Sequence, residues 1–194
     1  MPKYTYKLSD MLLQFERSEG VMEEVMGLTK FALPVMEAGT EELSGYSGLM
    51  GTLELVDWAS VGALELGLTF ADIPENGEIM ISPGKLNMKL SWAEKYATKA
   101  GDVGWNNYTV YATGFLKNFP GGDGEKGSKY EREYLYSLMK YKYCKDGSVV
   151  IEYDPANDVI SFYGKNHADD IKHAVLGDVE LVDGDGTPVE VVEG

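Results

Sequence analysis

Apolar and polar residues alternate along several stretches of the chain, with the period of two that is typical of half-buried β-strands. The clearest stretches cover residues 4–8, 61–70, 86–92, 108–116, 129–144, 148–153 and 159–163. Lys145, Asp146 and Gly147 separate two of them and favour a tight hairpin turn. The pattern predicts about six to nine strands, and hence a mainly β fold built as a β-sandwich or small split barrel.

The most conspicuous hairpin candidate covers residues 40–70. Its first part carries Gly45, Gly48 and Gly51 at every third position, which suggests bulges or the close approach of another backbone. A turn is expected at residues 57–60, followed by the alternating stretch 61–70. Pro34 ends the preceding apolar segment, so that segment is predicted to be a strand end or an edge.

Helical signals are few and short. Residues 74–81 start with Pro74 and predict a single helical turn. Residues 168–176 predict a helix of about two turns, because Gly177 suits the position just after a helix end. Residues 100–107 are rich in Gly, Asp and Asn and predict a turn. One or two short helices therefore complete the expected fold.

The chain is strongly acidic, and its charged residues are unevenly distributed. Lys and Arg number 17 against 32 Asp and Glu, which gives a net charge of −15. Residues 22–65 contain a single cation, Lys30, and these carboxylates: Glu23, Glu24, Glu37, Glu41, Glu42, Glu54, Asp57 and Glu65. Such a surface repels nucleic acid, because phosphate binding depends on clustered Lys and Arg. Residues 178–194 are also acidic and are expected to form a mobile extension to a single domain of residues 1–177.

No residue pattern predicts catalysis, a cofactor or a metal. His167 and His173 are six residues apart, so on a helix they face different sides and do not form a zinc pair. The stretch 122–129 has its Lys and Ser in the wrong order for a phosphate-binding loop, and 183–194 lacks the Gly and Glu of a calcium loop. Cys144 stands alone, which excludes an intrachain disulfide. No apolar stretch has membrane-spanning length and no signal peptide is apparent, so a cytoplasmic site of synthesis and no membrane contact are expected.

The order of several segments resembles the major tail tube proteins of contractile-tailed bacteriophages and related phage-tail-like particles. The matching segments are 27–34, 41–51, 113–119, the long strand to Cys144, 145–147, 152–154 and 163–166, and Asn166 to Asp169 approximate the usual ending before a short helix. Together they cover residues 22–177. Two departures are His167 in place of a Gly, and residues 178–194, which match nothing in the family.

The resemblance implies a structural subunit and no enzyme. Six copies would form a ring, and rings would stack into a tube inside a contractile sheath for DNA passage. A long hairpin from each subunit would join an inter-subunit barrel. Its expected lumen and contact residues are Glu41, Glu42, Gly45, Gly48, Gly51, Glu54, Asp57, Glu65 and Gly67. Other implied partners are the sheath, tape measure, baseplate and tail terminator proteins, with assembly in the host cytoplasm into the virion tail.

Two alternatives remain open at this point. One is the tube of a DNA-free bacteriocin or secretion-type particle, which would have the same fold. The other is a soluble β-sandwich that binds a small ligand or carbohydrate, with Trp58, Trp92 or Trp105 as a stacking platform.

Overall fold

The fold is seen in a computed structural model that describes residues 3–44, 51–74, 76–120 and 130–169. Nearly all regular structure within these ranges is β-strand, as the alternation predicts. The strands are β1 (Lys3–Ser18), β2 (Val21–Glu24), β3 (Leu28–Ala32), β4 (Ala38–Leu43), β5 (Leu53–Val61), β6 (Leu64–Phe70), β7 (Leu86–Thr98), β8 (Val103–Asn118), β9 (Arg132–Lys145), β10 (Ser148–Asp154), β11 (Val159–Phe162) and β12 (Lys165–Asn166). Two 3₁₀ turns, η1 (Gly77–Ile79) and η2 (Pro155–Asn157), accompany them.

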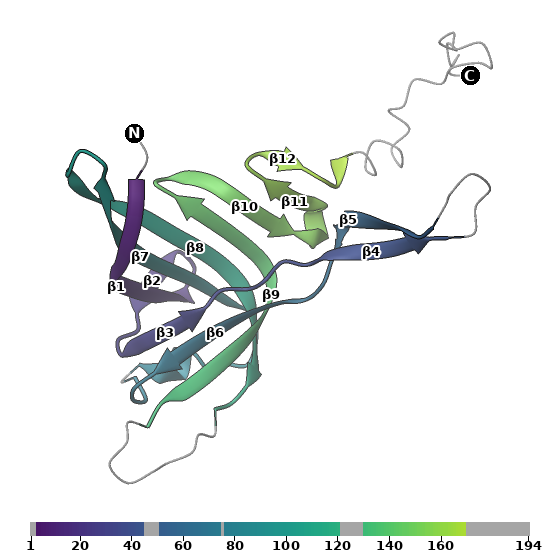
Figure 1. The fold of residues 1–194 in the computed structure, drawn as a ribbon. Coiled ribbons are helices and arrows are strands. Elements are labelled where there is room, and N and C mark those ends of the chain that lie inside the picture. The colour runs from purple at the N-terminus through teal and green to yellow at the C-terminus, as the bar shows by residue number, and fades with distance from the viewer. Residues whose placement is uncertain (1–2, 45–50, 75, 121–129, 170–194) are drawn as a thin grey trace, which may run out of the picture.

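One large antiparallel sheet forms the body, and β4 and β5 form a separate two-stranded sheet (Figure 1). The main path runs β12-β11-β10-β9-β8-β7-β1-β2, and β6 joins β9 with β3 outside it. Strand β9 has three partners: β8 along one edge, and on the other edge β6 at residues 132–138 and β10 at residues 141–145. The sheet therefore branches at β9 and bends around the core as a split barrel.

A sharp shift in register accompanies the bend between β8 and β9. Thr113 is opposite Lys140, but the next residue, Gly114, is opposite Leu138. A Cβ atom at Gly114 would overlap the carbonyl oxygen of Ser137, so the two backbones approach more closely here than any larger residue permits. The sheet does not close between β1 and β3, where an open hollow of about 480 Å³ remains.

The core lies inside this curved sheet. Strand β6 is its most buried element, with Leu64, Leu66, Leu68 and Phe70 all less than 2% exposed. Rings from neighbouring strands pack around it, including Phe70 edge-on to Tyr134 at 5.6 Å and Trp92 stacked on Tyr108 at 5.4 Å between centroids. Burial of these apolar side chains, at roughly 25 cal/mol per Å², is the main source of stability.

Several local predictions are confirmed. The stretch 86–92 lies in β7, 108–116 in β8, and 148–153 in β10. The turn between β9 and β10 has Asp146 at φ +48° and Gly147 at φ +82°, as a two-residue type I′ hairpin turn requires. The predicted helical turn at 74–81 contains η1, and Pro34 follows β3, which is an edge strand.

The predicted turn at residues 57–60 is wrong. Strand β5 includes all four residues, and its described pairing with β4 extends from Ala38 opposite Val61 to Leu43 opposite Leu53. No Gly or Pro occurs at 57–60, whereas Gly51 has φ +116°, a conformation that favours glycine. The predicted turn at 100–107 is also too long, since β8 already starts at Val103. The predicted helix at 168–176 and the extension 178–194 lie outside the described residues, apart from Ala168 and Asp169.

Candidate assembly interface

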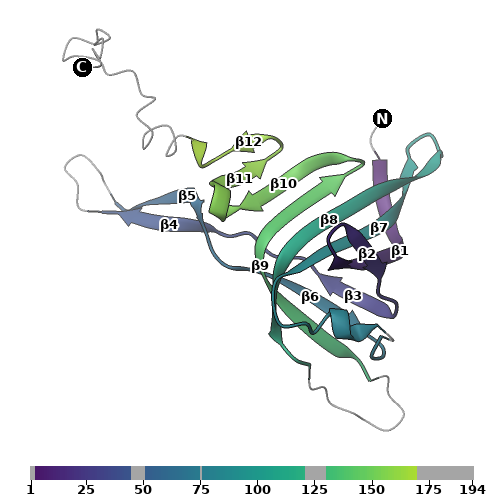
Figure 2. The same cartoon turned by 180° about the vertical axis from the view of Figure 1, so that it is seen from behind.

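Strands β4 and β5 form a hairpin that projects from the body, and this pair is called the projecting hairpin below (Figure 1). The same projection is visible from behind (Figure 2). Its register places Thr40 opposite Val56, Glu41 opposite Leu55, and Leu43 opposite Leu53. An isolated two-stranded ribbon is at best marginally stable in water, so a ribbon exposed on both faces is typical of an element that meets a partner.

The two faces of the projecting hairpin differ in character. One face carries Leu43, Leu53 and Leu55 together with Glu41 and Asp57, and of these leucines Leu53 is 46% and Leu55 44% exposed. The other face carries Glu42 directly opposite Glu54. Two like charges in directly opposed positions destabilise a strand pair. Both the exposed leucines and the paired carboxylates would be stabilised by a neighbouring surface.

The base of the hairpin is fitted closely to the body. A Cβ atom at Gly39 would lie 2.9 Å from Cβ of Ser60, beside a register shift between Ala38 and Gly39. Trp58 packs edge-on against Phe162 of β11, with 4.9 Å between ring centroids. Gly39 therefore holds the two strands of the hairpin close together at its base, and Trp58 attaches that base to the body.

The structure brings together some of the expected lumen residues and separates others. Glu41, Glu42, Glu54 and Asp57 lie on the projecting hairpin and are exposed. Gly51 lies in a bend just before β5, not in a strand as expected, and Gly45 and Gly48 lie outside the described residues.

The two remaining expected residues belong to the body. Glu65 and Gly67 lie in β6, which pairs with β3 and β9 and not with the first part of the predicted hairpin. Glu65 forms an ion pair with Lys117. Gly67 is buried, and a Cβ atom there would lie 3.1 Å from Oε1 of Glu133 and 3.3 Å from Cβ of Ala32. The alternation at 61–70 was a correct strand signal, but its long-range partner was wrongly assigned.

A second exposed surface was not anticipated from the sequence. It consists of Tyr4, Tyr6, Lys7, Lys95 and Trp105 on β1, β7 and β8, and is called the basic corner. Tyr4 and Tyr6 are each 57% exposed and Trp105 is 56% exposed. Lys95 Nζ lies 5.7 Å from the Trp105 ring centroid and 6.0 Å from that of Tyr6, within the range of cation–π contacts. Only the alternation at residues 4–8 hinted at this region, and it could not reveal the neighbours from β7 and β8.

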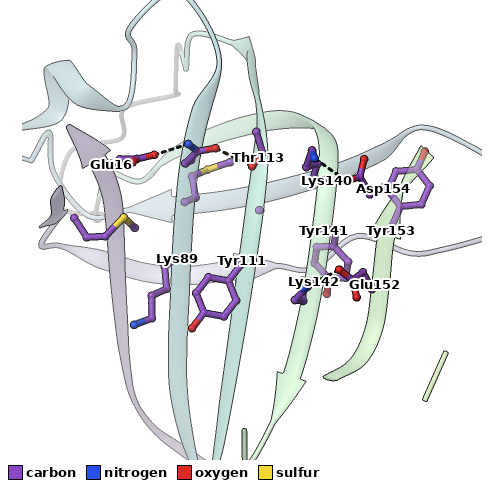
Figure 3. A pocket seen from close by; sticks show the side chains of 14 residues that line it. Glu16, Lys89, Tyr111, Thr113, Lys140, Tyr141, Lys142, Glu152, Tyr153 and Asp154 are labelled. Atoms are coloured by element: carbon purple, nitrogen blue, oxygen red, sulfur yellow. Dashed lines mark hydrogen bonds and ion pairs between the residues drawn. The ribbon is translucent and has the colours of Figure 1, made fainter. Parts of the chain in front are cut away.

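The face of the main sheet that points away from the core contains an open hollow of about 550 Å³ (Figure 3). Charged side chains from adjacent strands line it in pairs. Lys140 Nζ donates to Asp154 Oδ2 at 2.6 Å, and Lys142 Nζ lies 2.7 Å from Glu152 Oε1. The hydrogen bond to Glu152 is the main cause of a raised pKa of Lys142. Because these lysines and carboxylates are already paired with each other, they stabilise the sheet and are poorly suited to bind a charged ligand.

Buried and bonded groups in the body have shifted pKa values. A hydrogen bond from Asn87 is the main reason that the pKa of Glu16 is lowered. Burial raises the pKa of Tyr143 to about 12 and also raises that of Cys144. These shifts follow from packing and cross-strand bonding, and none belongs to a pair of groups arranged for proton transfer.

The described ranges hold no cluster of three or more His, Cys, Asp or Glu side chains that could bind a metal ion. Within them, no helix is long and apolar enough to cross a membrane. Of the three Trp residues, Trp92 is only 4% exposed and Trp58 packs on Phe162, so neither offers a free stacking platform.

The open curved sheet, the projecting hairpin and the basic corner define a mainly β structural protein with surfaces suited to self-association. A sequence model of the family "Phage tail tube protein FII" matches residues 19–177. The chain belongs to this family of phage tail tube proteins, and so it is a structural component of a virion tail. A search of curated proteins found no significant match.

Proposed function

We propose that this chain forms closed rings, six copies in each, that stack into a hollow tube inside a contractile sheath. The projecting hairpin carries the argument, because it exposes Leu53 and Leu55 and directly opposes Glu42 to Glu54. Both features are unfavourable in an isolated subunit and are relieved when a second copy covers them. Membership of the tail tube family supports the same role.

The tube would guide DNA without binding it. Glu42 and Glu54 are exposed on one face of the hairpin, which would line the bore, and carboxylates along a bore repel phosphates. Glu41 and Asp57 are exposed on the other face, beside Leu53 and Leu55. Gly45, Gly48 and Gly51 remain candidates for the same wall. The proposal is confined to these hairpin residues, because Glu65 is ion-paired with Lys117 and Gly67 is buried in the body.

The proposed role is structural and not enzymatic. The expected partners are further copies, the sheath, the tape measure protein, the baseplate and the tail terminator, with assembly in the host cytoplasm. A tube of a DNA-free bacteriocin or secretion-type particle is the nearest alternative. Capsid and terminase genes beside this gene would favour a phage, and their absence from a complete tail cluster would favour the alternative.

Electron microscopy of the purified full-length chain tests the proposal. Rings or tubes with a central bore are expected, and a strict monomer at high concentration would contradict it. The double variant Leu53→Ser/Leu55→Ser should abolish rings, whereas Ile81→Ser/Val149→Ser, which changes two similarly exposed apolar residues elsewhere, should not. In a reconstruction of the tube, a bore lined by other segments would refute the lumen assignment.

A further inference from the structure

The projecting hairpin and the basic corner lie at opposite ends of the molecule. Figures 1 and 2 show β4 and β5 extending from one side, while β1 and the adjoining ends of β7 and β8 form the other. A contact between one copy's hairpin and the next copy's corner would therefore join two different surfaces. Contacts of this heterologous kind generate a ring when the rotation between copies closes.

Each of the two surfaces carries a directly opposed pair of like charges, negative on the hairpin and positive on the corner. On the hairpin, Glu42 is directly opposite Glu54. On the corner, Lys7 is directly opposite Lys95, and Trp105 continues the same row on β8. Each like-charged pair is unfavourable by itself. None of the ion pairs formed among the described residues involves Lys7 or Lys95, although Lys95 lies over the rings of Tyr6 and Trp105.

The corner also has an open strand edge. Strand β1 pairs with β7 on one side, and on its other side β2 is paired only with residues 14–18. Over residues 3–12, no described strand pairs with that outer edge of β1. Such an edge accepts an extended segment through backbone hydrogen bonds. Strand β5 has nine residues, enough to cover most of it.

We propose that the projecting hairpin of one copy adds along the outer edge of β1 in the next copy, which sets Glu42 and Glu54 beside Lys7 and Lys95. The inference rests on the proposed function, since it names the surface that receives the hairpin within the ring. With β5 against β1, Glu54 and Lys7 become direct cross-strand neighbours, and Glu42 and Lys95 flank them one strand farther out. The exposed rings of Tyr4 and Tyr6 supply apolar contact area next to the charges.

A charge exchange between two variants tests this pairing. The variant Glu42→Lys/Glu54→Lys has a basic hairpin and a basic corner, and Lys7→Glu/Lys95→Glu has an acidic hairpin and an acidic corner. Each alone should lose roughly tenfold or more of its assembled fraction, because like charges then meet. Mixed in equal amounts, the two should assemble again, since every hairpin meets a corner of opposite charge. The exposed control Lys85→Glu/Lys165→Glu should assemble like the wild type.

The outcomes separate this inference from the proposed function. If the wild type forms no rings, the proposed function fails and the pairing fails with it. If the wild type assembles and either exchange variant does so too, or if mixing restores nothing, the pairing is overturned while the tube role stands. Thermal melts of each variant below its assembly concentration establish that it is folded.

Cross-linking gives a second, independent measurement. In a Cys144→Ser background, chains with Leu55→Cys and chains with Tyr6→Cys are mixed and oxidised. A disulfide-linked dimer in the mixture, and little in either chain alone, supports the pairing. Equal cross-linking in all three samples contradicts it.

Discussion

Trp58 packs edge-on against Phe162, with 4.9 Å between ring centroids and 71° between ring planes. The contact joins β5 of the projecting hairpin to β11 of the body. We predict that Trp58→Ala releases the base of the hairpin at a cost of about 1 kcal/mol, which is typical of one aromatic pair. Hydrogen exchange should accelerate in β5 but not in the buried strand β6. Trp58→Phe should keep most of the contact, and unchanged exchange in the Ala variant would refute its anchoring role.

Substitutions at two leucines should distinguish an effect on folding stability from an effect on assembly. Leu66 is fully buried in β6, whereas Leu55 is 44% exposed on the hairpin. Leu66→Ala should lower the free energy of unfolding by about 2–5 kcal/mol, because it leaves a cavity in the core. Leu55→Ala should change it by less than about 0.5 kcal/mol and yet weaken ring formation. Urea denaturation and sedimentation velocity measure the two effects, and a large loss of monomer stability in Leu55→Ala would contradict the assignment.

Gly114 is predicted to be essential to the bend of the main sheet. A Cβ atom there would overlap the carbonyl oxygen of Ser137 and lie 3.1 Å from Cα of Leu138. Since backbone cannot rotate away as a side chain can, Gly114→Ala should cost about 1–3 kcal/mol. Gly62→Ala is the matched control, because no atom lies within 4 Å of its Cβ position. Thermal denaturation of both variants makes the comparison, and equal melting temperatures would show that the sheet relaxes around the added methyl group.

Acid should destabilise the body through two carboxylates. The pKa of Glu16 is lowered mainly by Asn87; for Asp154, burial opposes the shift, but hydrogen bonds from Lys140 and Asn157 lower the pKa below 3.8. A lowered folded-state pKa gives stability that is present above the unfolded value and lost as pH falls through the folded value. The melting temperature should therefore fall as pH drops below about 4. Asp154→Asn should flatten this dependence, and an unchanged acid transition in that variant would contradict the role of Asp154.

Local sequence signals were sufficient to predict features that depend only on neighbouring residues, such as turns. Asp146 and Gly147 supply the positive φ values of their turn, and this was readable without any knowledge of the partner strands. The glycine spacing at 45–51 allows two interpretations, because glycine favours loops as strongly as it marks strand bulges, and of the three glycines the structure describes Gly51, which lies in a bend before β5. Position in the sequence alone could not decide between these two uses.

The assembly surfaces depended on pairings that no local pattern contains. The stretch 61–70 was a correct strand prediction, yet its neighbour is the distant strand β9. Lys7 and Lys95 become adjacent only because β1 pairs with β7. The acidic hairpin could be proposed from a run of carboxylates, whereas the basic corner is assembled from three separate strands and remains invisible until the sheet is built.

The link between β5 and β6 has a mechanical consequence. Only Gly62 and Ala63 separate the projecting hairpin from a strand bonded on both edges, to β3 and to β9. Tension along the hairpin therefore loads the ladders of β6 in shear, where many hydrogen bonds resist together. Bending of the hairpin is concentrated at the short link, which resists it only weakly because Gly62 has open space around it. An arm that resists stretching but bends at its base would let neighbouring subunits of the proposed ring tilt while the wall between them stays continuous.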